Sequence, residues 1–442
     1  MKVSIIGAGY AGLVTGACLA EKKHEVVCVD VDANKVATIN SGVSPIFEAG
    51  LDDLLARNVG RNLRATTNLA QAVLETDLTV IAVGTPFDGT NIDLTAVMVA
   101  AGEIGRALKA KSTYHVVVVK STVVPGTTDT YVLPAIEATS GRKAGDGFGV
   151  GMNPEFLSEG EAVHDFMYPD RIVLGGIDAR SIACLEALYE PFDPAVPRLK
   201  SNTRTAEMIK YASNALLATL ISFSNEFANM GSALGGIDTV DVMRGVHLSQ
   251  YFRGRSADDL PRIVSFLRAG CGFGGSCLPK DVRALIAHGR KAGVDMNVLS
   301  AVIGVNQSQP GKMVDLIRKH RPDLRGARVA VLGLSFKPET NDVRESPAFP
   351  IMRLLLSAGA EVKAFDPVAN EDAEKTFPMP VTYCKSLACA LDGVEIVIVV
   401  TPWKEFNQLP ELLRDRQPAV LVVDGRRAFD LHAFARYEGT GL

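Results

Sequence analysis

The chain has no excess of basic residues. Its 442 residues include 46 Lys and Arg against 50 Asp and Glu, which gives a formal net charge of −4. A protein that binds nucleic acid or anionic lipid through its summed field carries an excess of positive charge. The composition therefore predicts no nucleic-acid partner and no membrane partner, and any basic patch is expected to be local and sized for a small ligand.

Long hydrophobic runs are missing as well. No segment reaches the roughly 18 consecutive apolar residues of a membrane span. The apolar N-terminus, MKVSIIGAGYAGLVTG, lacks the charged region and the small-residue cleavage site of a signal peptide, and three glycines interrupt it. We expect a first strand there, and a cytosolic (cytoplasmic) protein.

Cysteine pairs are absent. The seven cysteines lie at positions 18, 28, 184, 271, 277, 384 and 389 without any C-x-x-C spacing. An odd, scattered set favours free thiols in a reducing compartment. Cys18 and Cys28 lie within apolar patterns and are expected to be buried small hydrophobes. Because the seven histidines are dispersed, the clustered ligands of a zinc alcohol dehydrogenase are missing and no metal is predicted.

Length and hydrophobic pattern predict several domains, since the chain is too long for one core. Short apolar runs alternate with helix-length segments near the N-terminus, and the same rhythm returns in ARVAVLGLSF, AEVKAFDP, VEIVIVVTPW and AVLVVDGR. This alternation is typical of βαβ units around a parallel sheet. Residues 204–230 contain neither proline nor glycine and keep helical spacing. We predict an α/β protein with two doubly wound Rossmann-like domains, 1–200 and 311–442, joined by a central helical domain, 201–310, with one long helix.

A glycine motif predicts a dinucleotide site. IIGAGYAG places Gly7, Gly9 and Gly12 in G-x-G-x-x-G spacing between a strand and a helical pattern, and Asp30 follows at the end of the second strand. The alternative is a tight turn that only packs a helix on a sheet. An acidic residue there accepts bonds from ribose hydroxyls and repels a 2′-phosphate, so the pattern predicts NAD and not NADP.

Two further strand ends belong to the same domain. VGTP carries Thr85, and KST carries Ser121 and Thr122. Ligands of an open parallel sheet lie outside the carboxyl ends of its strands. These hydroxyl groups are therefore expected near the ribose or the nicotinamide.

Cys277 lies in FGGSCLPKD, residues 273–281. Pro279 and Asp281 are typical of a helix start, and Lys280 is a local cation. Amide dipoles and a cation lower the pKa of a thiol, so Cys277 is a candidate nucleophile. A small residue that fills a tight turn remains the alternative on this segment alone.

Polar residues interrupt the long helix. Lys210 and Asn214 are four residues apart, and Glu207 precedes Lys210 by three, so all three share a face. A salt-bridged surface stripe explains Glu207 and Lys210 but not Asn214. NPEFLSEGEAVHDF adds Glu155 and Glu159 on a turn expected after the last strand of the first domain. Taken singly, such carboxylates are more often solvated or capping.

Eight motifs together resemble one family over nearly the whole chain: GAGYAGLVTG, KSTVVPGT, NPEFLSEG, PDRIVLGG, EMIKYASNALLATLISFSNE, GFGGSCLPKD, SFKPETNDVRESP and VVDGRR. In order and content they resemble the UDP-glucose/GDP-mannose 6-dehydrogenases. The resemblance implies oxidation of a nucleotide sugar at its C6 hydroxymethyl by two NAD⁺. A cysteine of these enzymes traps the aldehyde as a thiohemiacetal, which is oxidised to a thioester and hydrolysed.

The resemblance also implies catalytic residues: Cys277, Lys210, Asn214, Asp281, Glu155 and Thr122. By matching motifs, Cys277 is the nucleophile, and Lys210 and Asn214 steady the oxyanion, where fixed donors contribute on the order of 3 kcal/mol each. Asp281 positions or deprotonates a water, Glu155 is the base for thioester hydrolysis, and the threonine orients that chemistry.

Matching motifs imply two sets of binding residues. Those for the cofactor are Gly7, Gly9, Tyr10, Ala11, Gly12, Asp30, Lys35, Thr85, Pro86, Ser121, Thr122, Glu159, Lys280 and Arg344. Those for the nucleotide sugar are Glu155, Phe156, Leu157, Glu159, Lys210, Asn214, Arg262, Phe266, Arg268, Gly272, Phe273, Gly274, Phe336, Lys337 and Arg426. The family implies a homodimer or larger homo-oligomer, in which an arginine reaches a neighbouring subunit. The family's UDP-glucose members usually carry RIG five residues ahead of a phenylalanine-leucine pair, and this arginine is the one that reaches the neighbouring subunit. PRIVSFL around Arg262 is one residue shorter than that pattern and lacks its glycine.

The motifs divide between two substrates. EGEAVHDF, PDRIVLGG and VVDGRR resemble the UDP-glucose enzymes, whereas STVVPGT, KAGDGFGVGMNPEF and LPKDVRAL resemble the GDP-mannose enzymes. Because the arginine motif touches the substrate, UDP-glucose is the expected substrate and GDP-mannose the alternative. UDP-N-acetylhexosamine enzymes typically have histidine where this chain has Ser276. A non-catalytic nucleotide-sugar sensor would lack a reactive group, and none is missing.

Overall fold

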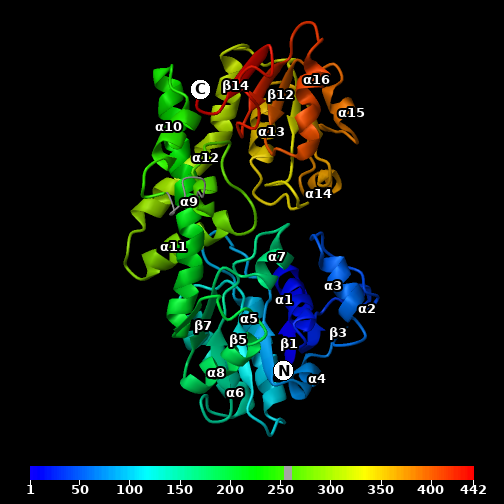
Figure 1. Cartoon of the computed structure of the whole chain (residues 1–442), viewed down its shortest axis with the longest axis vertical. Helices are drawn as coiled ribbons and strands as arrows, with labels where there is room; N and C mark the ends of the chain where they lie inside the picture. Colours follow the sequence, from blue (N-terminus) through cyan, green and yellow to red (C-terminus); the bar gives the residue numbers. More distant parts are fainter. Residues whose placement is uncertain (253–260) are drawn as a thin grey trace. The chain divides into compact units, whose positions relative to one another are not determined.

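The computed structural model describes residues 1–252 and 261–442 (Figure 1). The chain forms two compact units, Met1–Ser213 and Asn214–Leu442, which we call unit 1 and unit 2. In the described ranges, no helix has both the length and the apolar character that crossing a membrane requires.

Unit 1 contains an eight-stranded sheet of order β3-β2-β1-β4-β5-β6-β7-β8. Its strands are β1 (Lys2–Ile6), β2 (Glu25–Val29), β3 (Leu63–Thr66), β4 (Leu78–Ile81), β5 (Val116–Val119), β6 (Gly149–Met152), β7 (Ile172–Gly176) and β8 (Arg198–Ser201). All neighbouring strands are parallel except β6 and β7, which are antiparallel. The order of the first six is that of dinucleotide-binding folds, in which the strand order reverses between β1 and β4.

Helices pack on both faces of this sheet, because successive strand residues point to opposite sides. Ile5 belongs to one buried apolar cluster, with residues of α1, and Ile6 belongs to another, with residues of α5. The helices of unit 1 that end before the long central helix are α1 (Tyr10–Glu21), α2 (Ala33–Asn40), α3 (Leu51–Asn58), α4 (Leu69–Glu75), α5 (Thr95–Leu108), the short π-helix η1 (Thr128–Val132), α6 (Leu133–Ser140), α7 (Ala162–Met167) and α8 (Ala179–Leu188).

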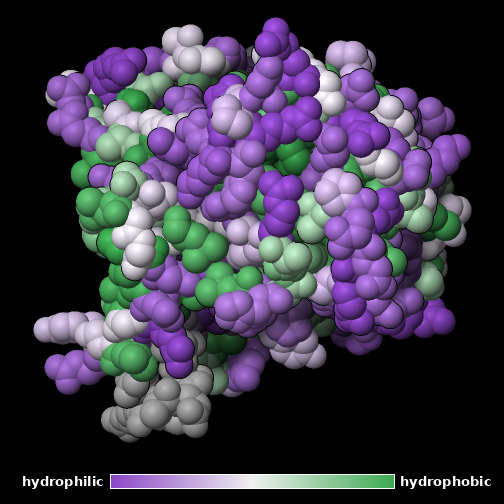
Figure 2. All heavy atoms as spheres, turned by 90° about the horizontal axis from the view of Figure 1, so that it is seen from above, coloured by the Kyte–Doolittle hydropathy of each residue, from purple (hydrophilic) through white to green (hydrophobic). Residues whose placement is uncertain are grey.

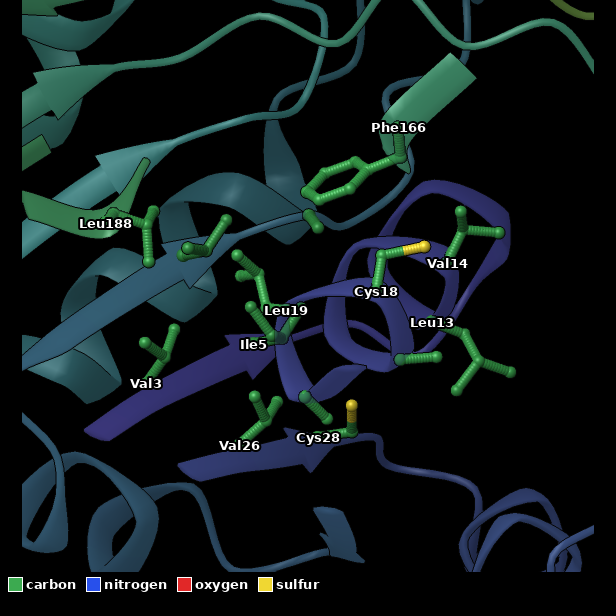
Figure 3. Close-up of a cluster of buried hydrophobic side chains, with 14 of the residues drawn as sticks. Val3, Ile5, Leu13, Val14, Cys18, Leu19, Val26, Cys28, Phe166 and Leu188 are labelled. Atoms are coloured by element: carbon green, nitrogen blue, oxygen red, sulfur yellow. The ribbon is translucent and has the colours of Figure 1, made fainter. Parts of the chain in front are cut away.

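The first cluster contains two cysteines. Figure 3 shows Cys18 of α1 and Cys28 of β2 among apolar side chains. Both are fully buried, and burial raises the pKa of each thiol to about 12. A side chain at Gly16 would place its Cβ 2.6 Å from the Cys28 sulfur, so this glycine lets α1 approach β2. The prediction that Cys18 and Cys28 are buried packing residues is confirmed.

Unit 2 contains a six-stranded parallel sheet of order β11-β10-β9-β12-β13-β14. Its strands are β9 (Arg328–Leu332), β10 (Glu361–Phe365), β11 (Thr382–Tyr383), β12 (Ile396–Val399), β13 (Leu421–Asp424) and β14 (Arg436–Gly439). This order repeats that of the first six strands of unit 1, with the reversal between β9 and β12. The unit therefore has a second doubly wound sheet with its own apolar core.

A helical segment precedes that sheet. The longest helix, α9 (Thr203–Leu234), begins in unit 1 and continues into unit 2. The other helices of unit 2 are α10 (Thr239–His247), the 3₁₀ turn η2 (Arg262–Phe266), α11 (Leu278–Lys291), α12 (Asn297–Arg318), α13 (Ala348–Ser357), α14 (Asn370–Thr376), α15 (Leu387–Leu391), the 3₁₀ turn η3 (Lys404–Gln408) and α16 (Leu409–Leu413).

The predicted fold class is confirmed: two Rossmann-like sheets and a helical segment with one long helix. One detail differs. The turn with Glu155 and Glu159 follows β6, and β7 and β8 extend the sheet beyond it. β6 (GVGM) is rich in glycine and β8 (RLKS) is polar, so neither has the apolar run that marks the central strands.

Candidate active site

The turn between β1 and α1 leaves room for a ligand. Gly7 has a φ of +97°, and a Cβ on Gly12 would lie 1.8 Å from the Gly7 carbonyl oxygen, so both positions require glycine. A Cβ on Gly9 would meet nothing within 4 Å. The exposed amides at the start of the 12-residue α1 thus face open space, which fits the pyrophosphate of a dinucleotide.

Asp30 lies next to this turn. Its carboxylate accepts a hydrogen bond from the amide of Ala8 at 3.0 Å and from the amide of Asp32 at 3.0 Å, and it pairs with Lys35 at 3.0 Å. Although burial opposes ionisation, these donors hold the pKa of Asp30 below its ordinary value. With three donors on two oxygens, the carboxylate still has acceptor capacity for a ribose hydroxyl.

Unit 2 has a matching aspartate, Asp366, directly after β10. Its Oδ2 accepts bonds from the Leu334 and Ser335 amides, the Ser335 hydroxyl and the Trp403 indole, and its Oδ1 accepts two more backbone amides. Six donors exhaust the roughly four lone-pair sites of a carboxylate. The second Rossmann-like sheet therefore lacks an available acid at the ribose position.

The hydroxyl residues predicted at the ends of β4 and β5 lie together. Thr85 donates to the Thr122 carbonyl at 2.7 Å, and Ser121 donates to the Val83 carbonyl at 2.7 Å. These bonds join the two strand ends at the carboxyl edge of the sheet. Both hydroxyls therefore position backbone at the edge where a ligand is expected.

Glu48, which sequence reasoning missed, ties the NPEFLSEG segment to α1. Its carboxylate accepts a hydrogen bond from the Tyr10 hydroxyl and from the amides of Gly160 and Ala162, at 2.7 and 2.8 Å. Burial raises the pKa of Tyr10, so the phenol stays protonated as donor. Tyr10, predicted as a cofactor residue, thus also anchors the turn beside Glu159.

A buried ion pair joins that turn to α9. Glu155 Oε1 lies 2.9 Å from Lys210 Nζ, and the two side chains are 12% and 4% exposed. The other Glu155 oxygen accepts the Leu157 amide at 2.7 Å. Burial opposes ionisation, but Lys210 and this amide hold the pKa of Glu155 below its ordinary value. The carboxylate is therefore ionised and oriented at neutral pH.

Lys120, also missed by sequence reasoning, is a second buried cation in this region. Its Nζ donates to Asn153 Oδ1 at 3.0 Å, and the Tyr189 hydroxyl donates to the same oxygen at 2.6 Å. Burial lowers the pKa of Lys120 to about 8. Its charge contributes to the low pKa of Glu155. The only sequence signal was its place at the end of an apolar strand.

Glu207 does not belong to a surface stripe with Lys210. It is fully buried and accepts bonds from the amides of Gly126 and Thr128 and from the Thr128 hydroxyl. Burial raises its pKa to about 6. The surface-stripe alternative is therefore wrong, and Glu207 fixes residues 126–128, which follow Thr122, against α9.

Glu207 predicts a pH dependence of stability. Its folded pKa, about 6, lies above the ordinary 4.5, so the folded protein retains a proton that the unfolded chain releases. The contribution of Glu207 to the free energy of unfolding is complete below pH 4.5, and it falls by about 2 kcal/mol as the pH rises through 6. Glu207→Gln removes the titration. We expect the thermal midpoint of the wild type minus that of the variant to decrease as the pH rises from 4.5 to 6.5. A constant difference would contradict the assignment.

In unit 2, Cys277 is the N-cap of α11, a helix of 14 residues with Pro279 in its first turn. The helix start expected from LPKD is therefore present. The Ser276 hydroxyl lies 3.5 Å from the Cys277 sulfur. The thiol is half-buried, in contrast to the fully buried Cys18 and Cys28.

Asp281 holds two predicted residues in place one turn after Cys277. Asn214 Nδ2 donates to one of its carboxylate oxygens at 2.6 Å, and Lys280 Nζ lies 2.6 Å from the other. Asp281 is 1% exposed, and its amide donates to the Cys277 carbonyl. The structure thus joins three residues that the sequence suggested on two separate motifs.

The glycines before Cys277 permit close packing of two loops. A Cβ on Gly274 would lie 2.3 Å from the Glu345 carbonyl oxygen, and one on Gly275 would lie 2.8 Å from the Phe336 ring. The Gly275 amide donates to the Arg344 carbonyl at 2.9 Å. The cysteine loop therefore lies against the SFKPETNDVRESP segment, with Phe336 at their contact.

Arg426 lies against the start of the same loop. Its Nε donates to the Val400 carbonyl at 2.8 Å, and the Cys271 amide donates to the Gly425 carbonyl at 2.9 Å. Phe273 exchanges two hydrogen bonds with the Asn306 side chain, at 2.7 and 3.0 Å. The carboxyl ends of β12 and β13 and the loop before Cys277 thus meet.

The other predicted positions lie in several segments of the two units. Arg344 pairs with Asp342. Gly272 has a φ of +100°, and Lys337 is half-buried beyond β9. In η2 and just after it, Arg262 and Arg268 are exposed, whereas Phe266 is half-buried. Ala11 lies in α1, Pro86 follows Thr85, and Phe156, Leu157 and Glu159 lie in the turn after β6.

Three family models match the chain in succession. They are described as the NAD binding domain, the central domain and the UDP binding domain of the UDP-glucose/GDP-mannose dehydrogenase family, and they match residues 1–193, 204–308 and 330–431. The chain belongs to this family. The resemblance read from the eight motifs is confirmed, as are the prediction of an NAD-dependent nucleotide-sugar dehydrogenase and that of NAD as its cofactor.

Named relatives of the family cover both expected substrates. A UDP-glucose 6-dehydrogenase of Haloferax volcanii is 45% identical over 97% of each chain. A GDP-mannose 6-dehydrogenase of Pseudomonas aeruginosa is 42% identical over 83% of this chain and 81% of its own. The structure of a UDP-glucose dehydrogenase from Pyrobaculum islandicum superposes with a TM-score of 0.90 at 40% identity, over 99% of this chain and 97% of that one.

Proposed function

We propose that this dehydrogenase oxidises the C6 hydroxymethyl of UDP-glucose to the carboxylate of UDP-glucuronate through a covalent intermediate on Cys277. One sugar alcohol, two NAD⁺ and one water give one carboxylate, two NADH and three protons. The observation that carries the proposal is the position of Cys277, a half-buried thiol at the N-terminus of α11, one turn before the Asp281 network. The glycine turn and Asp30 would hold NAD⁺, which would supply the hydride acceptor for both oxidations.

Cys277 keeps the half-oxidised sugar attached to the protein. Its sulfur adds to the C6 aldehyde, forming a carbon–sulfur bond while the carbonyl oxygen becomes an oxyanion and is protonated. Oxidation of this thiohemiacetal gives a thioester. Amide dipoles at a helix N-terminus favour the thiolate that this addition requires.

Lys210 and Asn214 stabilise the negative oxygen in this proposal. They lie one turn apart on α9, and each is held by a carboxylate, Glu155 for the lysine and Asp281 for the amide. A donor that is already oriented needs no reorganisation when charge develops. The buried carboxylates therefore serve to aim the donors.

Water completes the reaction by attacking the thioester carbon, after which the carbon–sulfur bond breaks and the Cys277 thiolate leaves. Glu155 is the proposed base for this water, with Asp281 as the residue that positions it. Support comes from the low pKa of Glu155, which keeps it ionised. Lys120 adds to this effect from its buried position beside Asn153.

The substrate assignment rests on coverage and on one motif. The UDP-glucose relative matches the chain nearly from end to end, whereas the GDP-mannose relative matches 83% of it. VVDGRR supplies Arg426, which we propose contacts the diphosphate together with Lys337. Phe336 would contact the nucleotide from the same loop.

A stoichiometry assay tests the whole proposal. With UDP-glucose limiting and NAD⁺ in excess, we expect two NADH per sugar, read at 340 nm, and uronate detected by mass spectrometry. Parallel assays with GDP-mannose should give a kcat/KM lower by at least about tenfold, a difference of roughly 1.4 kcal/mol in transition-state binding. A ratio of one NADH per sugar would remove the thioester step, and a preference for GDP-mannose would replace the substrate.

We further propose a homodimer. One face of α9 exposes large apolar side chains that recur at helical spacing and are 38% to 69% exposed: Leu216, Phe223, Phe227, Met230 and Leu234. Figure 2 shows hydrophobic areas on the side where Figure 1 places α9 and α10. An exposed apolar stripe of this kind is suited to packing against a second copy of the chain.

Sedimentation of the wild type should give a dimer, and the double variant Phe223→Glu with Met230→Glu should be a monomer. A wild-type monomer at micromolar concentration would contradict the proposal.

The proposal includes a cytosolic location. Cys277, which is half-buried, must stay reduced to act as a nucleophile. A reducing compartment provides that condition.

A further inference from the structure

Unit 2 has a concave site at the edge of its sheet opposite the proposed substrate loops. A cavity of about 330 Å³ lies over the amino ends of β9, β12, β13 and β14. Arg328 and Arg436 are the first residues of two of these strands, and Glu395 directly precedes β12. Phe336 and Arg426 follow the carboxyl ends of β9 and β13. A strand of four or five residues, about 15 Å, separates the two edges.

Four guanidinium groups line this cavity. Arg321 follows α12, Arg328 and Arg436 begin strands, and Arg416 follows α16, so they reach the cavity from different sides. The lining contains one carboxylate, Glu395, which pairs with Arg321 and with Arg328 at 3.3 Å. His320 also lines it and is paired with Glu438 at 2.7 Å. Positive charge is therefore concentrated here in a chain whose formal charge is −4.

Two of the arginines are not neutralised. In the part of the chain that the structure describes, neither Arg416 nor Arg436 forms a salt bridge with a carboxylate, and Arg436 donates only to the Ala419 carbonyl at 3.4 Å. Arg416 is half-buried. Like charges gathered in a concavity repel each other, and a bound anion removes that cost.

The shape and lining define the class of anion. A carboxylate has two oxygens in a plane and is satisfied by one guanidinium fork, whereas a phosphate presents three oxygens to donors from several directions. Pro418, which is exposed, and Ala419, which is half-buried, add apolar surface to the lining, so an organic body fits beside the charge. The volume is at the lower end of small-molecule pockets.

We propose that this cavity binds a small phosphate ester, the size of a sugar phosphate or nucleoside monophosphate, at a site separate from those of the cofactor and the nucleotide sugar. Arg416 and Arg436 contact the phosphate, and the Arg321–Glu395–Arg328 arrangement forms one wall. Pro418 and Ala419 supply apolar surface beside it. The inference stands independently of the proposed substrate, because it uses no residue of that site.

The test is a calorimetric titration of the full-length protein with glucose 6-phosphate, with UDP-glucose and NADH both saturating so that the other sites are filled. We expect one saturable site. Arg416→Gln with Arg436→Gln should weaken binding at least tenfold. Arg414→Gln with Arg353→Gln, which removes the same charge from exposed positions outside the cavity, should change it less than twofold. Unchanged turnover confirms that both variants are folded.

Other results would overturn the proposal. Absence of saturable binding to wild type would remove the site, and equal weakening in both double variants would mean unspecific charge attraction. Inorganic phosphate, which has no organic body, should bind at least fivefold more weakly than glucose 6-phosphate. Equal affinities would mean that the cavity recognises the free anion and not an ester.

Discussion

Cys277→Ser should lower uronate formation by at least about a thousandfold, because a serine hydroxyl is a far weaker nucleophile than a thiolate at neutral pH. The first oxidation does not need the sulfur. The variant should therefore release an aldehyde, detectable with a carbonyl-trapping reagent, and form one NADH per sugar in a single turnover. Binding of NAD to unit 1 should be unchanged, since the glycine turn and Asp30 are untouched.

A matched variant separates this role from general thiol effects. Cys389 is an exposed cysteine of the same unit, in α15, and Cys389→Ser should keep wild-type turnover. Mass spectrometry of the wild type during turnover should find a sugar adduct on Cys277 and none on Cys389. Wild-type uronate formation by Cys277→Ser would refute the nucleophile assignment.

Lys210→Met should impair both stability and catalysis. The change leaves Glu155 without its ion-pair partner, and removing one partner of a buried ion pair destabilises folded proteins by about 3 to 5 kcal/mol. Loss of an oxyanion donor costs about a hundredfold to a thousandfold in kcat. We expect a lower thermal midpoint at pH 7 and a kcat reduced to that extent.

The pH dependence identifies the carboxylate responsible. In wild type the pKa of Glu155 lies below its ordinary value, so the stability it contributes is present above that value and declines as the pH falls. In Lys210→Met the pKa of Glu155 rises, and its protonation removes the buried charge. The loss of stability relative to wild type should therefore become smaller as the pH falls. Lys210→Met with Glu155→Gln should regain stability but not activity. A deficit that is independent of pH would exclude this origin.

The sequence was sufficient for the central strands and the long helix. Runs such as VVVV in β5 are buried on both faces of the sheet, and a strand in that position has a continuous apolar sequence. Among the strands that were missed, β6 is rich in glycine and β8 is polar, and the antiparallel pairing of β6 with β7 leaves no mark in either segment.

Local and distant parts of the candidate site differ in the same way. The helix start at Cys277 could be predicted because Pro279 and Asp281 act on their own neighbourhood. The partners of Lys210 and Asn214 could not, because Glu155 and Asp281 lie far away in the sequence. Glu207 showed the error that follows: spacing suggested a solvated charge, whereas distant packing buries it. The assignment of roles to the site residues and the domain boundaries stay predictions.

The six hydrogen bonds on Asp366 have a consequence for competition between ligands. The two sheets have the same strand order. In a protein with two similar nucleotide-binding sheets, each nucleotide can compete for the site of the other. Because Asp366 is saturated by internal hydrogen bonds, only unit 1 offers a carboxylate, Asp30, for the ribose of the coenzyme. High levels of reduced coenzyme should then inhibit only against NAD⁺, without crowding out the sugar nucleotide.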